Sequence, residues 1–255
     1  MLLAIDVGNT DTKLGCFKPG TDELLHYWRV ATDLRRTADE YGVFFTQLFA
    51  TENVALPEID AVVIASVVPK LESALESVCR RYFGVAPSFL RADGQTLIPV
   101  RTEHPAESGA DLIAAAIGAR ARFGAPLVVI SFGTATAFIA VSAHGEYLGV
   151  SIAPGIAISI DALVGRTAKL PQVALETPQH AIGRNTIEAL QSGIVFGFVG
   201  QTEAIVSRIR AEMKAEAKVV ATGGLAEIVA KQTPIVDAVD PYLSLLGLKL
   251  FHESL

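Results

Sequence analysis

Long hydrophobic runs are missing from this 255-residue chain, although 51% of its residues are hydrophobic and its mean hydropathy is +0.41. The longest apolar stretches, residues 61–68 and 126–132, have strand length, well below the ~20 residues of a membrane-spanning helix. The opening MLLAID reaches an aspartate without a basic region, so no secretory signal is expected. The composition therefore predicts a globular protein without a membrane segment.

Cysteines and basic runs are also scarce. Cys16 and Cys79 stand apart, without the spacing of a disulfide framework or a zinc site, which fits a reducing, cytoplasmic compartment. The formal net charge is −6 and no long basic run occurs. This balance argues against a nucleic-acid partner held through its phosphates.

An internal repeat is the informative feature that the sequence does contain. Residues 2–30 read as strand, tight turn, strand, glycine-containing turn and strand, and residues 127–152 repeat this order. Asp6 and Ser131 correspond and lie 125 positions apart, about half the chain. Alternating helices and strands follow each three-strand meander, as expected for a mixed sheet covered by helices. A duplicated α/β unit is therefore predicted.

The remaining elements follow from hydrophobic periodicity. We predict helices over residues 38–51, 71–82, 108–123, 187–213, 225–231 and 242–251, and strands over 61–66, 87–90 and 218–222. We expect a first domain in residues 1–114 and a second in residues 115–255, with the last helix packing back on the first domain.

The turn after the first strand suits ATP. Gly8 lets a phosphate approach the backbone, and Asp6 can hold a hydrated magnesium ion. Hydrogen-bond donors and a positive charge follow at Thr10, Thr12 and Lys13. The alternative is an ordinary hairpin in which the Gly8-Asn9 pair supplies positive φ, and this turn alone favours the hairpin.

Two later glycine turns change that balance. Residues 131–136, Ser-Phe-Gly-Thr-Ala-Thr, occupy the same place in the second half, with Gly133 and Thr134 at the turn. Two facing turns form a cleft that one turn cannot, so the pair favours nucleotide binding. Gly223 and Gly224, at a strand-to-helix junction, suit adenosine or its phosphates, although Gly-Gly is also a common way to turn a strand into a helix.

These turns together resemble the acetate and sugar kinase, heat-shock protein and actin superfamily, with its duplicated ribonuclease-H-like fold. More narrowly, the chain resembles the type III pantothenate kinases in the order and spacing of several stretches. They are residues 3–12, 65–69, 109–111, 132–136, 152–155, 182–186 and 191–193.

The resemblance implies transfer of the ATP γ-phosphate to the primary hydroxyl of pantothenate, the first step of coenzyme A synthesis. By position, Asp111 would be the general base. The implied ATP contacts are Asp6, Gly8, Asn9, Thr10, Thr12, Lys13, Gly133, Thr134, Gly223 and Gly224. The implied pantothenate contacts are Gly109, Ala110, Asp111 and Thr186. The family pattern also implies a homodimer, magnesium near Asp6 and a monovalent cation.

The chemistry of residues 108–111 leaves two interpretations of Asp111. An aspartate base is suitable because positioning and charge neutralisation do most of the work in phosphoryl transfer. The same residues also form a capping sequence, with Ser108 as N-cap and an acid three residues later. Residue types alone leave capping and catalysis equally open.

Four positions depart from the family pattern. Leu112 replaces the arginine that follows the catalytic aspartate, and Ser131 replaces the aspartate that holds the monovalent cation. Thr102 replaces a tyrosine of the substrate pocket, and Ile139 replaces an aspartate after the second turn. Leucine cannot substitute for a two-point guanidinium contact. At Ser131, a neutral hydroxyl replaces the carboxylate that would bind K⁺ or NH₄⁺, so binding of this cation is doubtful.

Three functions therefore stay open at this point. The first is a working pantothenate kinase, and the second is a catalytically weakened paralogue that acts as one subunit of a heteromeric kinase. The third is a nucleotide-binding regulatory protein. We rank them in this order.

Overall fold

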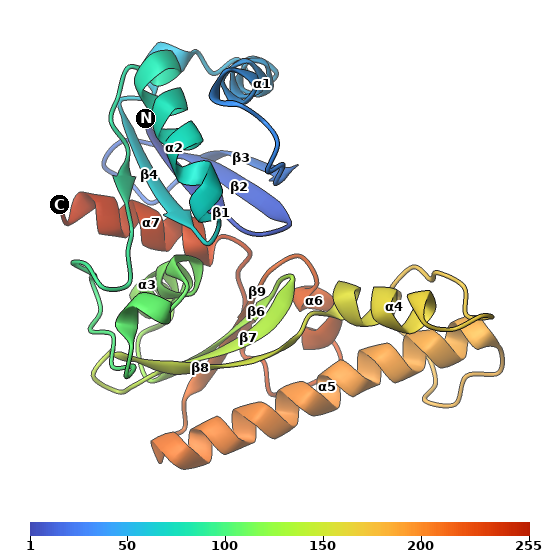
Figure 1. Ribbon diagram of the computed structural model, residues 1–255. Coiled ribbons are helices and arrows are strands. Elements are labelled where there is room, and N and C mark those ends of the chain that lie inside the picture. Colours follow the sequence, from blue (N-terminus) through green and yellow to red (C-terminus); the bar gives the residue numbers. More distant parts are fainter. The chain divides into compact units, whose positions relative to one another are not determined.

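The computed structural model describes residues 1–255 and contains two five-stranded sheets (Figure 1). The chain forms two compact units, Met1–Gly118 with Leu243–Leu255 and Ala119–Tyr242. Each unit has one sheet and its own apolar core. The division into domains 1–114 and 115–255 stays a prediction. The last helix belongs to the first unit.

The first unit has the strand order β3-β2-β1-β4-β5. Its antiparallel meander consists of β1 (Leu2–Val7), β2 (Asp11–Phe17) and β3 (Leu24–Ala31), and the parallel strands are β4 (Ala61–Ser66) and β5 (Ser88–Phe89). Its helices are α1 (Ala38–Ala50), α2 (Pro69–Val78) and α7 (Leu243–Glu253). Strand β1 has neighbours on both sides, so its apolar side chains are almost completely buried.

The second unit repeats this topology with the order β10-β9-β6-β7-β8. Its strands are β6 (Leu127–Phe132), β7 (Ala135–Val141), β8 (Tyr147–Pro154), β9 (Lys218–Thr222) and β10 (Ala238–Val239). Its helices are α4 (Ile156–Gly165), α5 (Thr186–Met213) and α6 (Ala226–Ala230). Strand β6 takes the place of β1, and the meander β6-β7-β8 takes that of β1-β2-β3. The predicted duplication is thereby confirmed.

Several element boundaries differ from the sequence-based predictions. Helix α2 starts at Pro69, a favourable first helical residue, and continues as a π-helical turn over Cys79–Phe83. Ser131 lies inside β6, so the prediction that the second turn begins there was wrong. Helix α4 was not predicted, and helix α3 (Ala110–Phe123) begins two residues later than expected.

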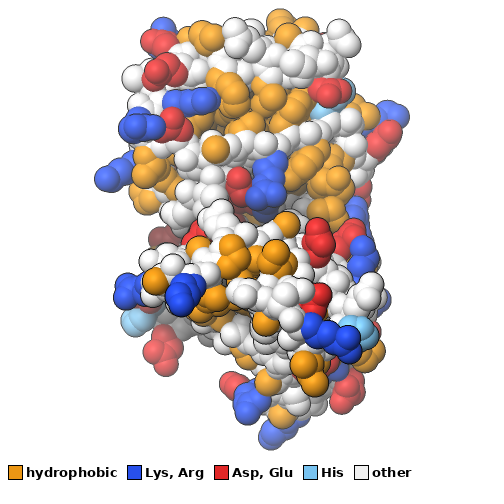
Figure 2. Space-filling view, turned by 90° about the vertical axis from the view of Figure 1, so that its right-hand side faces the viewer, with side chains coloured by type: hydrophobic (Ala, Val, Ile, Leu, Met, Phe, Trp, Pro, Cys, Tyr) orange, Lys and Arg blue, Asp and Glu red, His pale blue; other side chains and the backbone are white.

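The helices and the surface give two further facts. None of the helices combines the length and apolar character that crossing a membrane requires. Figure 2 shows Lys and Arg side chains interspersed with Asp and Glu side chains on the face that it draws, with hydrophobic patches between them. Charge on that face is therefore mixed in sign.

Candidate active site

Asp6 is a buried carboxylate near the end of the central strand β1, with 4% of its surface exposed. The antiparallel register pairs Asp6 with Lys13 of β2, which places the two side chains on the same face of the sheet. Oδ2 of Asp6 accepts hydrogen bonds from Lys13 Nζ at 3.1 Å and from Ser244 Oγ at 2.6 Å. Because both bonds go to Oδ2, they fix the orientation of the carboxylate, and neither of them occupies Oδ1.

Asp111 lies in the first turn of α3 and is partly buried. Burial and the negative charge of Asp6 raise the pKa of Asp111 to about 6, while backbone hydrogen bonds and the positive charge of Lys13 act in the opposite direction. The pKa of Lys13 is raised chiefly by the charge of Asp6 and to a smaller extent by that of Asp111. These three groups, Asp6, Lys13 and Asp111, form one electrostatic cluster in the first unit.

The start of α3 differs from the capping interpretation of residues 108–111, in which Ser108 would be the N-cap. The carbonyl of Gly109 accepts the N–H groups of Leu112 and Ile113, so Gly109 directly precedes the first helical residue, Ala110. A Cβ on Gly109 would lie 2.5 Å from Oδ1 of Asp111. Glycine at position 109 therefore leaves room for the Asp111 carboxylate to fold back over the helix start.

Thr32, just after β3, holds the first turn in shape. Its Oγ1 donates to the Gly8 carbonyl at 2.8 Å, and its N–H donates to the Thr10 carbonyl at 2.8 Å. The hydroxyl of Thr12 is buried and lies 2.9 Å from that of Thr32. Within the turn, the Gly8 N–H donates to the Asp11 carbonyl at 3.0 Å. The tip of the turn, Asn9 and Thr10, is exposed.

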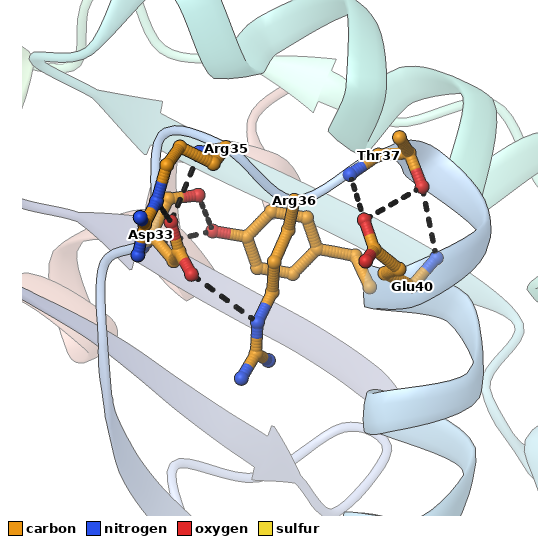
Figure 3. Close-up of polar contacts among 6 residues, drawn as sticks. Asp33, Arg35, Arg36, Thr37 and Glu40 are labelled. Atoms are coloured by element: carbon orange, nitrogen blue, oxygen red, sulfur yellow. Dashed lines mark hydrogen bonds and ion pairs between the residues drawn. The ribbon is translucent and has the colours of Figure 1, made fainter.

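The segment that follows Thr32 is fixed by its own polar contacts (Figure 3). Asp33 accepts the N–H of Arg35 at 3.0 Å, and the Asp33 carbonyl accepts the hydroxyl of Tyr41 at 2.9 Å. Thr37 and Glu40 form a capping box at the start of α1. These contacts fix the segment next to Thr32, so Thr32 can hold the turn at residues 8–11 in place. The sequence around Thr32 carries no local signal for this role.

The second turn is supported differently, by close backbone packing. The Gly133 N–H donates to the Ala135 carbonyl at 3.0 Å. Gly155 follows β8 as Thr32 follows β3, and a Cβ on Gly155 would overlap the carbonyl groups of Gly133 and Thr134. A side chain at position 155 would therefore displace the turn.

The replacement Gly155→Ala is expected to destabilise the protein by about 1–3 kcal/mol, because the added methyl group meets backbone that cannot move aside easily. The measurement is the free energy of unfolding from urea denaturation. Gly200→Ala is the matched control, since Gly200 lies on an exposed face of α5 with nothing within 4 Å of a Cβ. That change should stabilise by about 1 kcal/mol, and equal effects of the two changes would contradict the prediction.

The two turns differ in charge. In the second sheet, the register sets Ser131 opposite Ala137 on one side and Thr222 on the other. The position that holds an Asp6–Lys13 ion pair in the first unit thus holds a serine and an alanine in the second. No carboxylate lies beside Ser131 in the sheet, so these residues do not fit a cation site that depends on negative charge.

Asp6 and its turn do fit a magnesium–nucleotide complex. Mg²⁺ takes oxygen ligands and is usually held through one or two carboxylates together with phosphates and water. Asp6 offers one oriented carboxylate next to an exposed turn that contains Gly8. A side chain at position 8 would bring a Cβ within 2.9 Å of the Asp11 carbonyl, so glycine also keeps the turn narrow.

The other predicted site residues lie in the second unit. Gly223 has φ of +98°, and a Cβ there would overlap the Phe132 carbonyl. The positive φ and the close approach of the Phe132 backbone therefore explain why this residue is a glycine. Gly224 is exposed before the short helix α6. Thr186 is the exposed first residue of α5, after the N-cap Asn185. Gly109, Ala110 and Asp111 therefore belong to one unit, and Thr186 belongs to the other.

The fold defines the class first, which is an α/β protein built from two duplicated units, each with a mixed five-stranded sheet. A structure described as the activator of the 2-hydroxyisocaproyl-CoA dehydratase from Clostridium difficile with bound ADPNP has this fold. It superposes with a TM-score of 0.59 at 14% identity, covering 99% of this chain and 95% of that chain.

Sequence comparison then gives the family. The model of the family "Type III pantothenate kinase" matches residues 2–208. A type III pantothenate kinase of Myxococcus xanthus is 48% identical over 252 residues, covering 99% of this chain and 98% of that protein. One from Geobacillus kaustophilus is 43% identical over 254 residues, covering 100% and 98%. The chain belongs to the type III pantothenate kinase family.

Proposed function

We propose that this chain catalyses the ATP-dependent phosphorylation of pantothenate to 4′-phosphopantothenate, the first step of coenzyme A biosynthesis. Membership in the family supports this proposal. The observation that carries it is the cluster of Asp6, Lys13 and Asp111 beside a glycine turn. A base, a cation and a metal-binding carboxylate are the groups that phosphoryl transfer to an alcohol requires.

Asp111 has the role of general base in this proposal. Its pKa of about 6 leaves it ionised at neutral pH, yet basic enough to accept the proton of the attacking hydroxyl. Lys13 neutralises charge on the transferred phosphoryl group. Asp6 would hold magnesium through water, and the ion would supply positive charge to the phosphates of the nucleotide.

The glycine turns and the remaining positions bind the two substrates. Backbone N–H groups of the turns are suited to phosphate oxygens. The proposed ATP contacts are Asp6, Gly8, Asn9, Thr10, Thr12, Lys13, Gly133, Thr134, Gly223 and Gly224. The proposed pantothenate contacts are Gly109, Ala110, Asp111 and Thr186. Leu112 has no guanidinium group to bind a carboxylate or phosphate beside Asp111. Lys13 is therefore the group that supplies positive charge within the cluster of Asp6, Lys13 and Asp111.

The test is ADP release by the purified chain with ATP, magnesium and pantothenate. We expect release that depends on pantothenate and proceeds equally in sodium, potassium or ammonium salts, because Ser131 and its neighbours in the sheet provide no carboxylate. Release without pantothenate, or none at all, would count against the proposal. Activity that appears only with a second co-purifying subunit would point instead to a heteromeric kinase.

We further infer a homodimer located in the cytoplasm. The edge strand β8 exposes Leu148, Val150 and Ile152, an apolar row suited to a protein contact. Cys16 and Cys79 are buried free thiols, which fits a reducing compartment. Light scattering of the purified chain tests the dimer.

A further inference from the structure

Helix α7 lies outside residues 2–208, which the family model matches, yet it packs in the middle of the first unit. Its leucines Leu243, Leu245, Leu246 and Leu248 are buried. A Cβ on Gly15 of β2 would lie 2.9 Å from Cδ1 of Leu245, so α7 rests directly on the sheet. Figure 1 shows α7 beside the strands β1 and β4.

Helix α7 also touches α3 at the level of the backbone. A Cβ on Gly118 would overlap the Leu243 carbonyl, and one on Gly247 would overlap the Ala114 carbonyl. Such close approach leaves little freedom for the two helices to slide, because packed interiors have no spare volume. Since Asp111 lies in the first turn of α3, this contact fixes the position of Asp111 relative to α7.

The first turn of α7 reaches the other carboxylate of the site. Ser244 is 6% exposed, and its Oγ donates to Oδ2 of Asp6 at 2.6 Å. Short hydrogen bonds to an ionised carboxylate are stronger than neutral ones. Ser244 and Lys13 together hold Oδ2 from two elements, α7 and β2, so the carboxylate plane cannot rotate without breaking a bond.

We propose that α7 is the positioning element of the site and that Ser244 is its positioning residue. The Ser244 hydroxyl orients Asp6 toward the magnesium–nucleotide complex, and the α3–α7 contact holds Asp111 at a fixed distance from that carboxylate. The catalytic part of this inference rests on the proposed function, whereas the nucleotide-binding part does not require pantothenate to be the acceptor.

The experiment compares Ser244→Ala with Ser244→Thr, which keeps the hydroxyl. Ser254→Ala is the matched control, because the hydroxyl of that serine, which directly follows α7, donates to the Phe251 carbonyl. Binding of a non-hydrolysable ATP analogue is measured by calorimetry at several magnesium concentrations. We expect Ser244→Ala to weaken magnesium-dependent affinity about tenfold, and Ser244→Thr and Ser254→Ala to keep it. The KM for pantothenate should not change in any variant.

The outcomes separate this inference from the proposed function. Unchanged magnesium-dependent affinity in Ser244→Ala, at an unchanged thermal midpoint, would overturn the role of Ser244. Loss of affinity in Ser244→Ala that Ser244→Thr shares would also overturn it, because the hydroxyl would then not be the cause. A wild-type chain that binds the analogue but does not phosphorylate pantothenate would overturn the proposed function and leave Ser244 supported. A wild-type chain that binds no nucleotide would overturn both.

Discussion

Replacing Asp111 with asparagine is expected to lower kcat by about 10²–10⁴-fold, the usual contribution of a positioned general base. Asparagine has nearly the same shape and can still accept backbone N–H groups at the start of α3, but it cannot accept the proton of the attacking hydroxyl. The measurement is steady-state ADP release at saturating ATP and pantothenate. Asp93→Asn, an exposed aspartate of the same unit, is the control and should keep full activity.

The pH dependence gives a second readout of the same variant. The pKa of Asp111 is raised from 3.8 to about 6 in the folded protein, so the wild-type rate should rise as the pH rises through about 6. Because the folded state binds this proton more tightly than the unfolded chain, ionised Asp111 lowers stability above that pH. Asp111→Asn should therefore raise the thermal midpoint at pH 7, and this gain should shrink toward pH 4. A lowered midpoint at pH 7 would indicate a structural role instead.

Replacing Asp6 with asparagine is the other change with a large expected effect. A bound metal ion contributes several kcal/mol to the transition state, and each 1.36 kcal/mol is a factor of ten in rate, so kcat/KM should fall by about 10³-fold. Asparagine can still accept from Ser244, but it no longer balances the charge of Lys13. Titration of activity against magnesium is the measurement, and an unchanged magnesium requirement would refute the assignment.

The double variant Asp6→Asn with Lys13→Met controls for stability. The Asp6–Lys13 pair is partly buried, and removing one partner of such a pair leaves an uncompensated charge, whereas removing both does not. We expect the single Asp6→Asn variant to lose stability and the double variant to recover much of it. Activity should stay low in both variants, which separates the loss of the proposed metal-binding carboxylate from a general loss of the fold.

Local sequence patterns predicted most of the fold, because repeated turns and alternating strands carry their signal within a few residues. The three-strand meanders were recognised in both halves of the chain from the turns at Gly8 and Gly133. Helix α4 was missed because its sequence, IAISIDALVG, is rich in isoleucine and its N-cap, Gly155, has no side chain to cap the helix. The length of β6 was underestimated because Ser131 was assigned to the turn although the ladder continues through Phe132.

Parts of the candidate site could not be read from the sequence, for a physical reason. The Asp6–Lys13 pair follows from local register, since the two residues flank one turn symmetrically. Ser244 is 238 positions away from Asp6, and only the docking of α7 on the first sheet brings them together. Thr32 was missed for a similar reason, because its bonds to Gly8 and Thr10 depend on where β3 ends.

The place of α7 in the chain has a consequence for biosynthesis. Strands β1 to β5 leave the ribosome early, but the helix that covers their sheet follows the whole of the second unit. Until it arrives, the apolar surface that receives Leu245 stays open to water and to other chains. A fragment containing only residues 1–118 should therefore aggregate, and a nascent chain should gain nucleotide affinity only after residues 243–253 have been translated.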